Sequence, residues 1–169
     1  MKIIVTADTH GKTESLKKLI SHLDNSFYFV HLGDVVRDFE SVRPLLDEKG
    51  IKYSNVKGNC DFSGPSFYSR LSIEGKEIGI VHGHQQRVKE TLVRLDEYAR
   101  ERDLDAILYG HTHISKIGYG TTGILLMCPG SLGEPKSGKA SFGVLEISGG
   151  ILKPRIVLAE EMDKYFEER

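Results

Sequence analysis

Histidine, aspartate and asparagine side chains gather in five short clusters along this chain of 169 residues. Five of the seven histidines lie in these clusters, and four of the five clusters close a run of apolar residues. Imidazole nitrogens and carboxylate or amide oxygens are ligands that divalent metal ions accept. The clusters are, in chain order, Asp8-Thr9-His10, Gly33-Asp34, Gly58-Asn59-Cys60-Asp61, His82-Gly83-His84 and Gly110-His111-Thr112-His113.

Each cluster taken alone also has a simpler explanation. Gly33-Asp34 is a common turn sequence, and an isolated Asn59 can occupy a left-handed turn without binding anything. One histidine of His82-Gly83-His84 could be a buried, hydrogen-bonded side chain rather than a ligand. Taken together, the five clusters favour metal binding over these simpler explanations, because so many ligand residues at the ends of apolar segments are improbable by chance. His22 and His31 lie outside the clusters, and no role is predicted for them.

The elements that position the clusters follow from hydrophobic spacing. A continuous apolar run such as Ile3–Val5 is typical of a strand buried on both faces, and apolar residues three and four apart indicate helices. The pattern predicts a short helix near 42–46 with Pro44 in its first turn, and a longer helix over 88–99. Strands are predicted at 3–5, 27–32, 52–56, 71–73, 76–81, 105–109, 116–119, 124–127, 142–147 and 151–158.

Strand–helix–strand units come first in this order, and glycine-separated antiparallel strands come later. This order predicts an α/β fold of two packed mixed β-sheets flanked by helices. We expect a single domain over 1–169, in which the charged segment 160–169 is a tail or a short solvated helix. Ligands of open α/β sheets bind beyond the carboxyl ends of the strands. The five clusters could therefore converge on one site, and their ligand set fits two divalent metals.

Composition narrows the range of partners. The net charge is −1, and no basic tract is present, so no stable nucleic-acid partner is expected. The sequence contains no apolar stretch typical of a signal peptide or a membrane span. Only two cysteines, Cys60 and Cys128, are present, which favours a reducing compartment over a disulfide framework. These observations predict a cytoplasmic protein without a membrane partner.

The ordered series Asp-x-His, Gly-Asp, Gly-Asn-x-Asp, His-Gly-His and Gly-His-x-His resembles the calcineurin-like metallophosphoesterase superfamily. The resemblance extends from Ile3 to about Ser131. The small size, Gly58-Asn59-Cys60-Asp61 and Pro129-Gly130-Ser131 make the chain similar to the small bacterial and archaeal phosphodiesterase branch, to which the retromer scaffold subunit also belongs. The family fold is a two-sheet α/β sandwich with outer helices, which agrees with the fold predicted from the spacing.

The resemblance implies a site residue by residue. Asp34 would bridge two metals, and His84 would face the substrate or support a ligand. Asn59 would bind a metal and also help to place a phosphate oxygen. The first metal would be held by Asp8, His10 and His113, and the second by Asn59, His82 and His111.

Two positions depart from the wider superfamily. Cys60 stands where many members have a histidine proposed as general acid, and a neutral thiol is a poor acid because its ordinary pKa is about 8.5. Arg37 follows the bridging position at a different spacing from the arginine of larger phosphatases. It could face a phosphate or remain a solvated surface side chain.

The resemblance implies a dinuclear metal-dependent phosphodiesterase, in which a hydroxide bridging the metals attacks a small phosphodiester or nucleotide-like substrate. The mixed ligands suit manganese, iron, nickel or zinc, and the resemblance favours manganese. Two alternatives remain: a phosphomonoesterase or nucleotide phosphatase, and a non-catalytic protein-interaction scaffold like the retromer subunit. Apolar strand edges in the C-terminal part are compatible with a homodimer.

Overall fold

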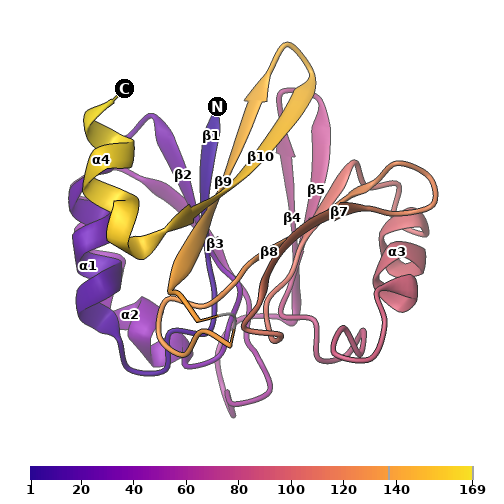
Figure 1. The fold of residues 1–169 in the computed structure, drawn as a ribbon, viewed down its shortest axis with the longest axis horizontal. Helices are drawn as coiled ribbons and strands as arrows, with labels where there is room; N and C mark the ends of the chain where they lie inside the picture. The colour runs from indigo at the N-terminus through magenta and orange to yellow at the C-terminus, as the bar shows by residue number, and fades with distance from the viewer. Residues whose placement is uncertain (137, 169) are drawn as a thin grey trace.

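The computed structural model describes residues 1–136 and 138–168, and within them two five-stranded β-sheets pack face to face with helices on the outside (Figure 1). This arrangement confirms the predicted fold class. The first sheet has the strand order β10-β9-β1-β2-β3, and the second has the order β4-β5-β6-β8-β7. Among the described residues, no helix is both long and apolar enough to cross a membrane.

In the first sheet, β1 pairs in parallel with β2 and antiparallel with β9. In the second, β5, β6 and β8 are parallel, and β4 and β7 are antiparallel edge strands. The strands are β1 Lys2–Thr6, β2 Phe27–His31, β3 Lys52–Asn55, β4 Tyr68–Ile73, β5 Lys76–Val81, β6 Ala106–Leu108, β7 Ser115–Tyr119, β8 Leu125–Pro129, β9 Ser141–Ser148 and β10 Ile151–Leu158. The helices are α1 Thr13–Ser21, α2 Val36–Glu48, α3 Val93–Arg100, the 3-10 turn η1 Ala159–Glu161 and α4 Met162–Glu167.

Three buried apolar layers hold these elements together. Ile3 and Val5 point into the layer between the two sheets, whereas Ile4 packs on the opposite face under α1 and α2. Successive strand residues point to opposite faces, so the continuous run Ile3–Val5 supplies two layers at once. The third layer lies between the second sheet and α3, which contributes Leu95.

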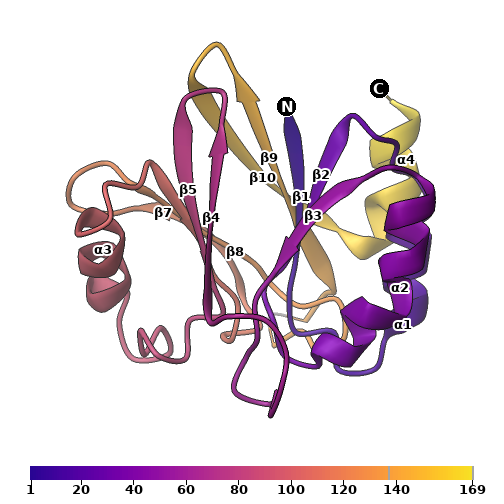
Figure 2. The ribbon, with the colours of Figure 1, turned by 180° about the vertical axis from the view of Figure 1, so that it is seen from behind.

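The carboxyl ends of the parallel strands of both sheets meet at one edge of the molecule. Figures 1 and 2 show this edge at the bottom of the ribbon, opposite the β4–β5 and β9–β10 hairpins. The loops that follow β1, β2, β3, β5 and β6 all lie there, and these loops contain the five polar clusters.

Two predicted helices have different bounds in the structure. Helix α2 begins at Val36 and encloses Pro44, whereas the sequence predicted a short helix with Pro44 in its first turn. The earlier start has a tertiary cause, because the Asp61 carboxylate accepts a hydrogen bond from the Val36 N–H at 2.8 Å. Helix α3 begins only at Val93, since the chain from 84 to 90 forms turns, including the positive φ of 55° at Arg87.

The segment 160–169, predicted to be a tail or a short solvated helix, forms the short helix α4 over Met162–Glu167, but one face of this helix is buried. Helix α4 packs onto the first sheet, where Met162 and Tyr165 join the buried layer under α1. Asp163 on the outer face accepts hydrogen bonds from Lys18 at 2.8 Å and pairs with His22 at 3.0 Å. The segment is therefore an amphipathic helix despite its high charge, and the contact between His22 and Asp163 helps to hold it against α1.

Candidate metal centre

The loops at the shared edge bring six of the seven predicted ligands into two groups that have Asp34 in common. In each group, one ligand atom per residue lies within 4.8 Å of every other. The first group comprises Asp8, His10, Asp34 and His113, and the second comprises Asp34, His82 and His111. The seventh residue, Asn59, joins the second group, because its Oδ1 lies 3.2 Å from His82 Nε2.

The two oxygens of Asp34 face different groups. Oδ1 lies 3.3 Å from His82 Nε2, and Oδ2 lies 3.9 Å from His10 Nε2. Burial raises the pKa of Asp34, but hydrogen bonds from His82 and from the backbone N–H of Cys60, together with the charge of His82, outweigh it and hold the pKa well below its usual range. Asp34 is therefore a carboxylate that can bind one cation with each oxygen.

His82 is aimed into the second group by a backbone contact. Its Nδ1 donates to the Leu32 carbonyl at 2.8 Å, which leaves Nε2 to face Asn59 Oδ1 and His111 Nδ1, each at 3.2 Å. Burial lowers the pKa of His82, but Asp34 and Asp8 overcome this effect and raise it above the ordinary value. Burial and the charge of His82 lower the pKa of His111 to about 4, so His111 is neutral and able to bind a metal.

The first group contains buried polar atoms that have no hydrogen-bond partner in the described structure. These atoms are Asp8 Oδ1 and His10 Nε2. Asp8 is completely buried, and burial raises the pKa of its carboxyl. His113 Nδ1 lies 2.7 Å from the Glu134 carbonyl, and its Nε2 lies 3.5 Å from Asp8 Oδ1. Unpaired buried acceptors are costly, and a divalent cation would satisfy both atoms.

Left-handed backbone is concentrated at these ligands. Five of the seven have positive φ angles, from 42° at His10 to 68° at His111. Residues other than glycine adopt this conformation uncommonly, mainly in turns and at functional sites. The other three are Asp8 at 52°, Asp34 at 56° and His113 at 60°.

The remaining predicted site residues lie at the rim of this cluster. His84 is outside both groups, with its ring centroid 5.3 Å from that of His82 and its Nδ1 buried without a partner. Burial and the charge of His82 lower the pKa of His84. The thiol of Cys60 is accessible to solvent, and local burial and the charge of Asp34 raise its pKa to about 11. Arg37 is exposed and lines a cavity with Cys60 and Phe62.

Three buried residues support the ligand loops, and the sequence pattern did not assign them this role. Asp38 accepts hydrogen bonds from Thr9 Oγ1 at 2.8 Å and from the Gly11 N–H. Ser131 Oγ donates to the Asp8 carbonyl at 2.7 Å. His31 accepts a hydrogen bond at Nδ1 from the Gly33 N–H at 3.2 Å. Asp38 and Ser131 stand in or beside the family motifs, but their contacts arise only when distant loops meet.

Comparison with known proteins points to one family. The family model described as the calcineurin-like phosphoesterase superfamily domain matches residues 1–150. The chain is 33% identical over 138 residues to the probable metallophosphoesterase YsnB of Bacillus subtilis (strain 168), and the alignment covers 80% of this chain and 78% of that protein.

Solved structures share the fold. A predicted phosphoesterase from Streptococcus pneumoniae TIGR4 has a TM-score of 0.76 and 25% identity, covering 94% of this chain and 90% of its own. Zinc-complexed Vps29 from Entamoeba histolytica has a TM-score of 0.70 and 21% identity, and the match covers 94% of this chain and 99% of the Vps29 chain. An archaeal phosphodiesterase has a TM-score of 0.69 and 19% identity, and the match covers 93% of this chain and 100% of that chain. At such identities the last two indicate the fold alone.

Proposed function

Because the chain belongs to the calcineurin-like phosphoesterase superfamily, we propose that it is a hydrolase of phosphoric diesters that works with two divalent metal ions. The shared position of Asp34 carries this proposal. Its two oxygens face two separate ligand groups, at 3.3 Å from His82 and 3.9 Å from His10. A carboxylate in this position suits a pair of metals better than one metal.

The residues present fit such metals. The unpaired, buried Asp8 Oδ1 and His10 Nε2 would gain a cation as partner. The first metal would be held by Asp8, His10 and His113, the second by Asn59, His82 and His111, and Asp34 would bind both. Mixed imidazole, carboxylate and amide ligands suit manganese, iron, nickel or zinc, and we propose manganese.

When bound, two metals would supply Lewis acidity and a water of lowered pKa. The chain's own groups would orient the substrate around them. His84 has a buried nitrogen without a partner and a depressed pKa, so its imidazole is neutral near pH 7 and can donate one hydrogen bond to a phosphate oxygen. The side-chain amide of Asn59, whose Nδ2 donates to Cys60 Sγ at 3.5 Å, would be a second donor for phosphate.

Two features favour a diester over a monoester. One cavity is lined by Thr112, which stands between His111 and His113, and another is lined by Val35 and Cys60, which follow Asp34 and Asn59 in the chain, so each could hold one arm of a diester. The raised pKa of Cys60 makes its thiol a weak proton donor. Alkyl monoesters, whose alkoxide leaving group needs a proton, are therefore poorer substrates in this proposal than diesters with stable leaving groups.

The test is a substrate screen on protein reconstituted with manganese, nickel, iron or zinc, with a chelator as control. Bis(p-nitrophenyl) phosphate should be hydrolysed faster than alkyl phosphomonoesters, and the chelator should abolish turnover. Turnover that persists in chelator, or faster hydrolysis of alkyl monoesters, would contradict the proposal.

The fold shared with Vps29 keeps a protein-interaction scaffold as a second candidate. The complete ligand set argues for the enzyme, and a lack of turnover with every metal would favour the scaffold. The exposed Ile117 and Tyr119 on the edge strand β7 offer a surface for a second copy of the chain, and light scattering would test this homodimer. The free thiols of Cys60 and Cys128 suit the proposed cytoplasmic location.

A further inference from the structure

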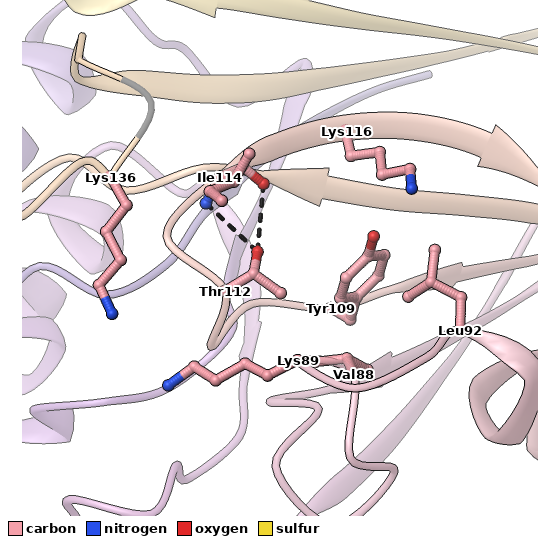
Figure 3. A pocket seen from close by; sticks show the side chains of 8 residues that line it. All are labelled: Val88, Lys89, Leu92, Tyr109, Thr112, Ile114, Lys116 and Lys136. Carbon is pink, nitrogen blue, oxygen red and sulfur yellow. Dashed lines mark hydrogen bonds between the residues drawn. The ribbon is translucent and has the colours of Figure 1, made fainter.

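A cavity of about 410 Å³ opens beside the loop that carries two of the predicted metal ligands. Thr112, which stands between His111 and His113, is part of its wall (Figure 3). The hydroxyl of Thr112 is engaged within the protein, because it contacts the backbone N–H and carbonyl of Ile114, each at 3.2 Å. The wall is thus fixed, and other groups of the cavity are available to a ligand.

Three lysines surround this cavity: Lys89, Lys116 and Lys136. In the part of the chain that the structure describes, none of their ammonium groups forms an ion pair with a carboxylate. Other lysines are neutralised in this way, as Lys139 is by Glu160 and Lys76 by Asp105. The cavity therefore concentrates uncompensated positive charge on a molecule whose net charge is −1.

Between the lysines the cavity is apolar. Val88, Leu92 and Ile114 line it, together with the ring of Tyr109. In Figure 3 the phenol oxygen of Tyr109, a side chain that is only 1% exposed, points toward the side of the cavity on which Lys116 lies. An apolar wall with a few polar groups at its rim is the usual form of a small-molecule pocket.

One wall of the cavity belongs to the loop that carries the predicted ligands His111 and His113. In the view of Figure 3, the ammonium groups of Lys89 and Lys136 lie on the side of Thr112, and that of Lys116 lies at the other end. The backbone N–H of Lys136 donates to the carbonyl of His113 at 3.0 Å. Lys89 lines the same cavity as Thr112, which stands between the predicted ligands His111 and His113.

We propose that this cavity binds a second phosphate of the substrate, so that the natural substrates are diesters with one arm that carries a ring and an additional phosphate group. This inference rests on the proposed diesterase function. The ring would lie against Leu92 and Ile114, and the additional phosphate would be held by Lys89 and Lys136. Ammonium groups bind phosphate as charge-assisted donors.

The dimensions favour a small ligand over a polynucleotide. A volume of about 410 Å³ is in the range of pockets for single small molecules, roughly 300–1,000 Å³. A long polyanion would need a basic stripe that extends over many phosphates. The three lysines here line one cavity and form no extended stripe, which suits a nucleotide-sized arm.

Two chromogenic diesters test the proposal: thymidine 5′-(p-nitrophenyl phosphate) with and without a 3′-phosphate. Both release nitrophenolate from the same bond, and they differ only in the additional phosphate. We expect kcat/KM to be about tenfold higher for the 3′-phosphorylated compound, which is one decade of affinity. In the double variant K89Q/K136Q the ratio should fall to about one, whereas K139Q, from the same loop, should keep the ratio of the unaltered protein.

A binding measurement separates this inference from the proposed function. Titration calorimetry of metal-free protein with thymidine 3′,5′-bisphosphate should show binding that weakens about tenfold in K89Q/K136Q and remains unchanged in K139Q. Circular dichroism would verify that both variants are folded. Lysine-dependent binding without any ester hydrolysis by metal-loaded protein would support the cavity and refute the diesterase. Equal binding by all three proteins would overturn the inference. So would a ratio of kcat/KM for the two diesters that is the same in K89Q/K136Q as in the unaltered protein.

Discussion

Backbone conformation and ligand identity coincide at single residues of this site. Asp8, Asp34 and His113 combine positive φ with buried or nearly buried side chains. A residue in a sparsely populated backbone region costs about 1–3 kcal/mol, which the surrounding structure must offset. Such residues persist where function requires them, so the five left-handed ligands are an argument for a metal site that is independent of the sequence motif.

Asp34→Asn tests the bridging role. Asn tolerates the left-handed backbone as Asp does, so the fold should be retained. The change removes charge shared by both ligand groups, and turnover should fall by more than the roughly 10–100-fold that follows loss of an outer-shell partner. Elemental analysis should show both metals depleted together. A variant that keeps one metal and much of its activity would contradict the bridge, and Asp105→Asn, remote from the site, is the control.

Cys60→His tests the missing proton donor. An imidazole at this position could protonate the leaving oxygen, which the thiol with a pKa raised to about 11 does poorly. A positioned acid contributes about 10²–10⁴-fold, so hydrolysis of alkyl esters should rise at least tenfold, and aryl diesters should change little. Parallel kinetics on both substrate types would measure this. Loss of aryl diester turnover in Cys60→Ala at full metal occupancy would instead assign the thiol a catalytic role.

At the scale of elements, the site depends on how closely two loops approach. The loop after β2 meets the loop after β3 so tightly that a Cβ on Gly58 would strike the Asp34 carboxylate and lie 2.6 Å from its backbone nitrogen. A Cβ on Gly33 would lie 2.6 Å from the Gly58 nitrogen. Glycine at these positions lets the bridging carboxylate sit between two strand ends.

Gly58→Ala should therefore impair activity more than stability. The methyl group would displace Asp34, and an overpacked site costs about 1–3 kcal/mol, whereas the altered geometry at the shared ligand should remove most metal binding and turnover. Thermal unfolding and steady-state kinetics would be measured together. Gly118→Ala on β7 is the matched control, because its Cβ would meet nothing within 4 Å. Equal losses in both variants would contradict this view of the loops.

The same scale separates what the sequence could predict from what it could not. Strands such as β1 and β2 were predictable because both faces are buried, so their apolar runs are continuous. The start of α2 was not, because its cap is Asp61, 25 residues beyond Val36. Residues 162–167 were misjudged because their charges face Lys18 and His22, contacts that exist only after α1 and α4 pack together.

Part of the candidate site could be predicted from the sequence, and part could not. Ligand types and their position after strands were visible in the sequence, and the structure brings those side chains together. The supports were not visible, because Asp38 holds the loop of Thr9 from 29 residues away and Ser131 reaches Asp8 across 123 residues. Both residues stand in or beside family motifs, but the sequence alone does not show which distant group each side chain contacts.

At the scale of the whole molecule, the ligand groups concentrate charge that opposes folding without metal. Asp8 and Asp34 repel each other, and each is buried. The negative charges of Asp8 and Asp34 outweigh the effect of burial on His82 and raise its pKa. A protonated His82 therefore compensates the two carboxylates in metal-free protein. A metal ion would take over this compensation and displace the proton.

Added metal should therefore raise the melting temperature, and the increase should widen as pH rises from 6 to 8. Because the pKa of His82 is raised in the folded state, its proton stabilises metal-free protein. This stabilisation is complete when the pH is below about 6.5, the pKa of histidine in the unfolded chain, and it is lost as the pH rises through the pKa in the folded protein. Metal-loaded protein does not need that proton. At a free metal concentration of 100 Kd the gain is about 2.7 kcal/mol, which calorimetry with manganese or chelator would detect. Asp34→Asn should show a smaller increase that depends less on pH, because only Asp8 then raises the pKa of His82. A pH-independent increase in the unaltered protein would contradict the proposed competition between proton and metal.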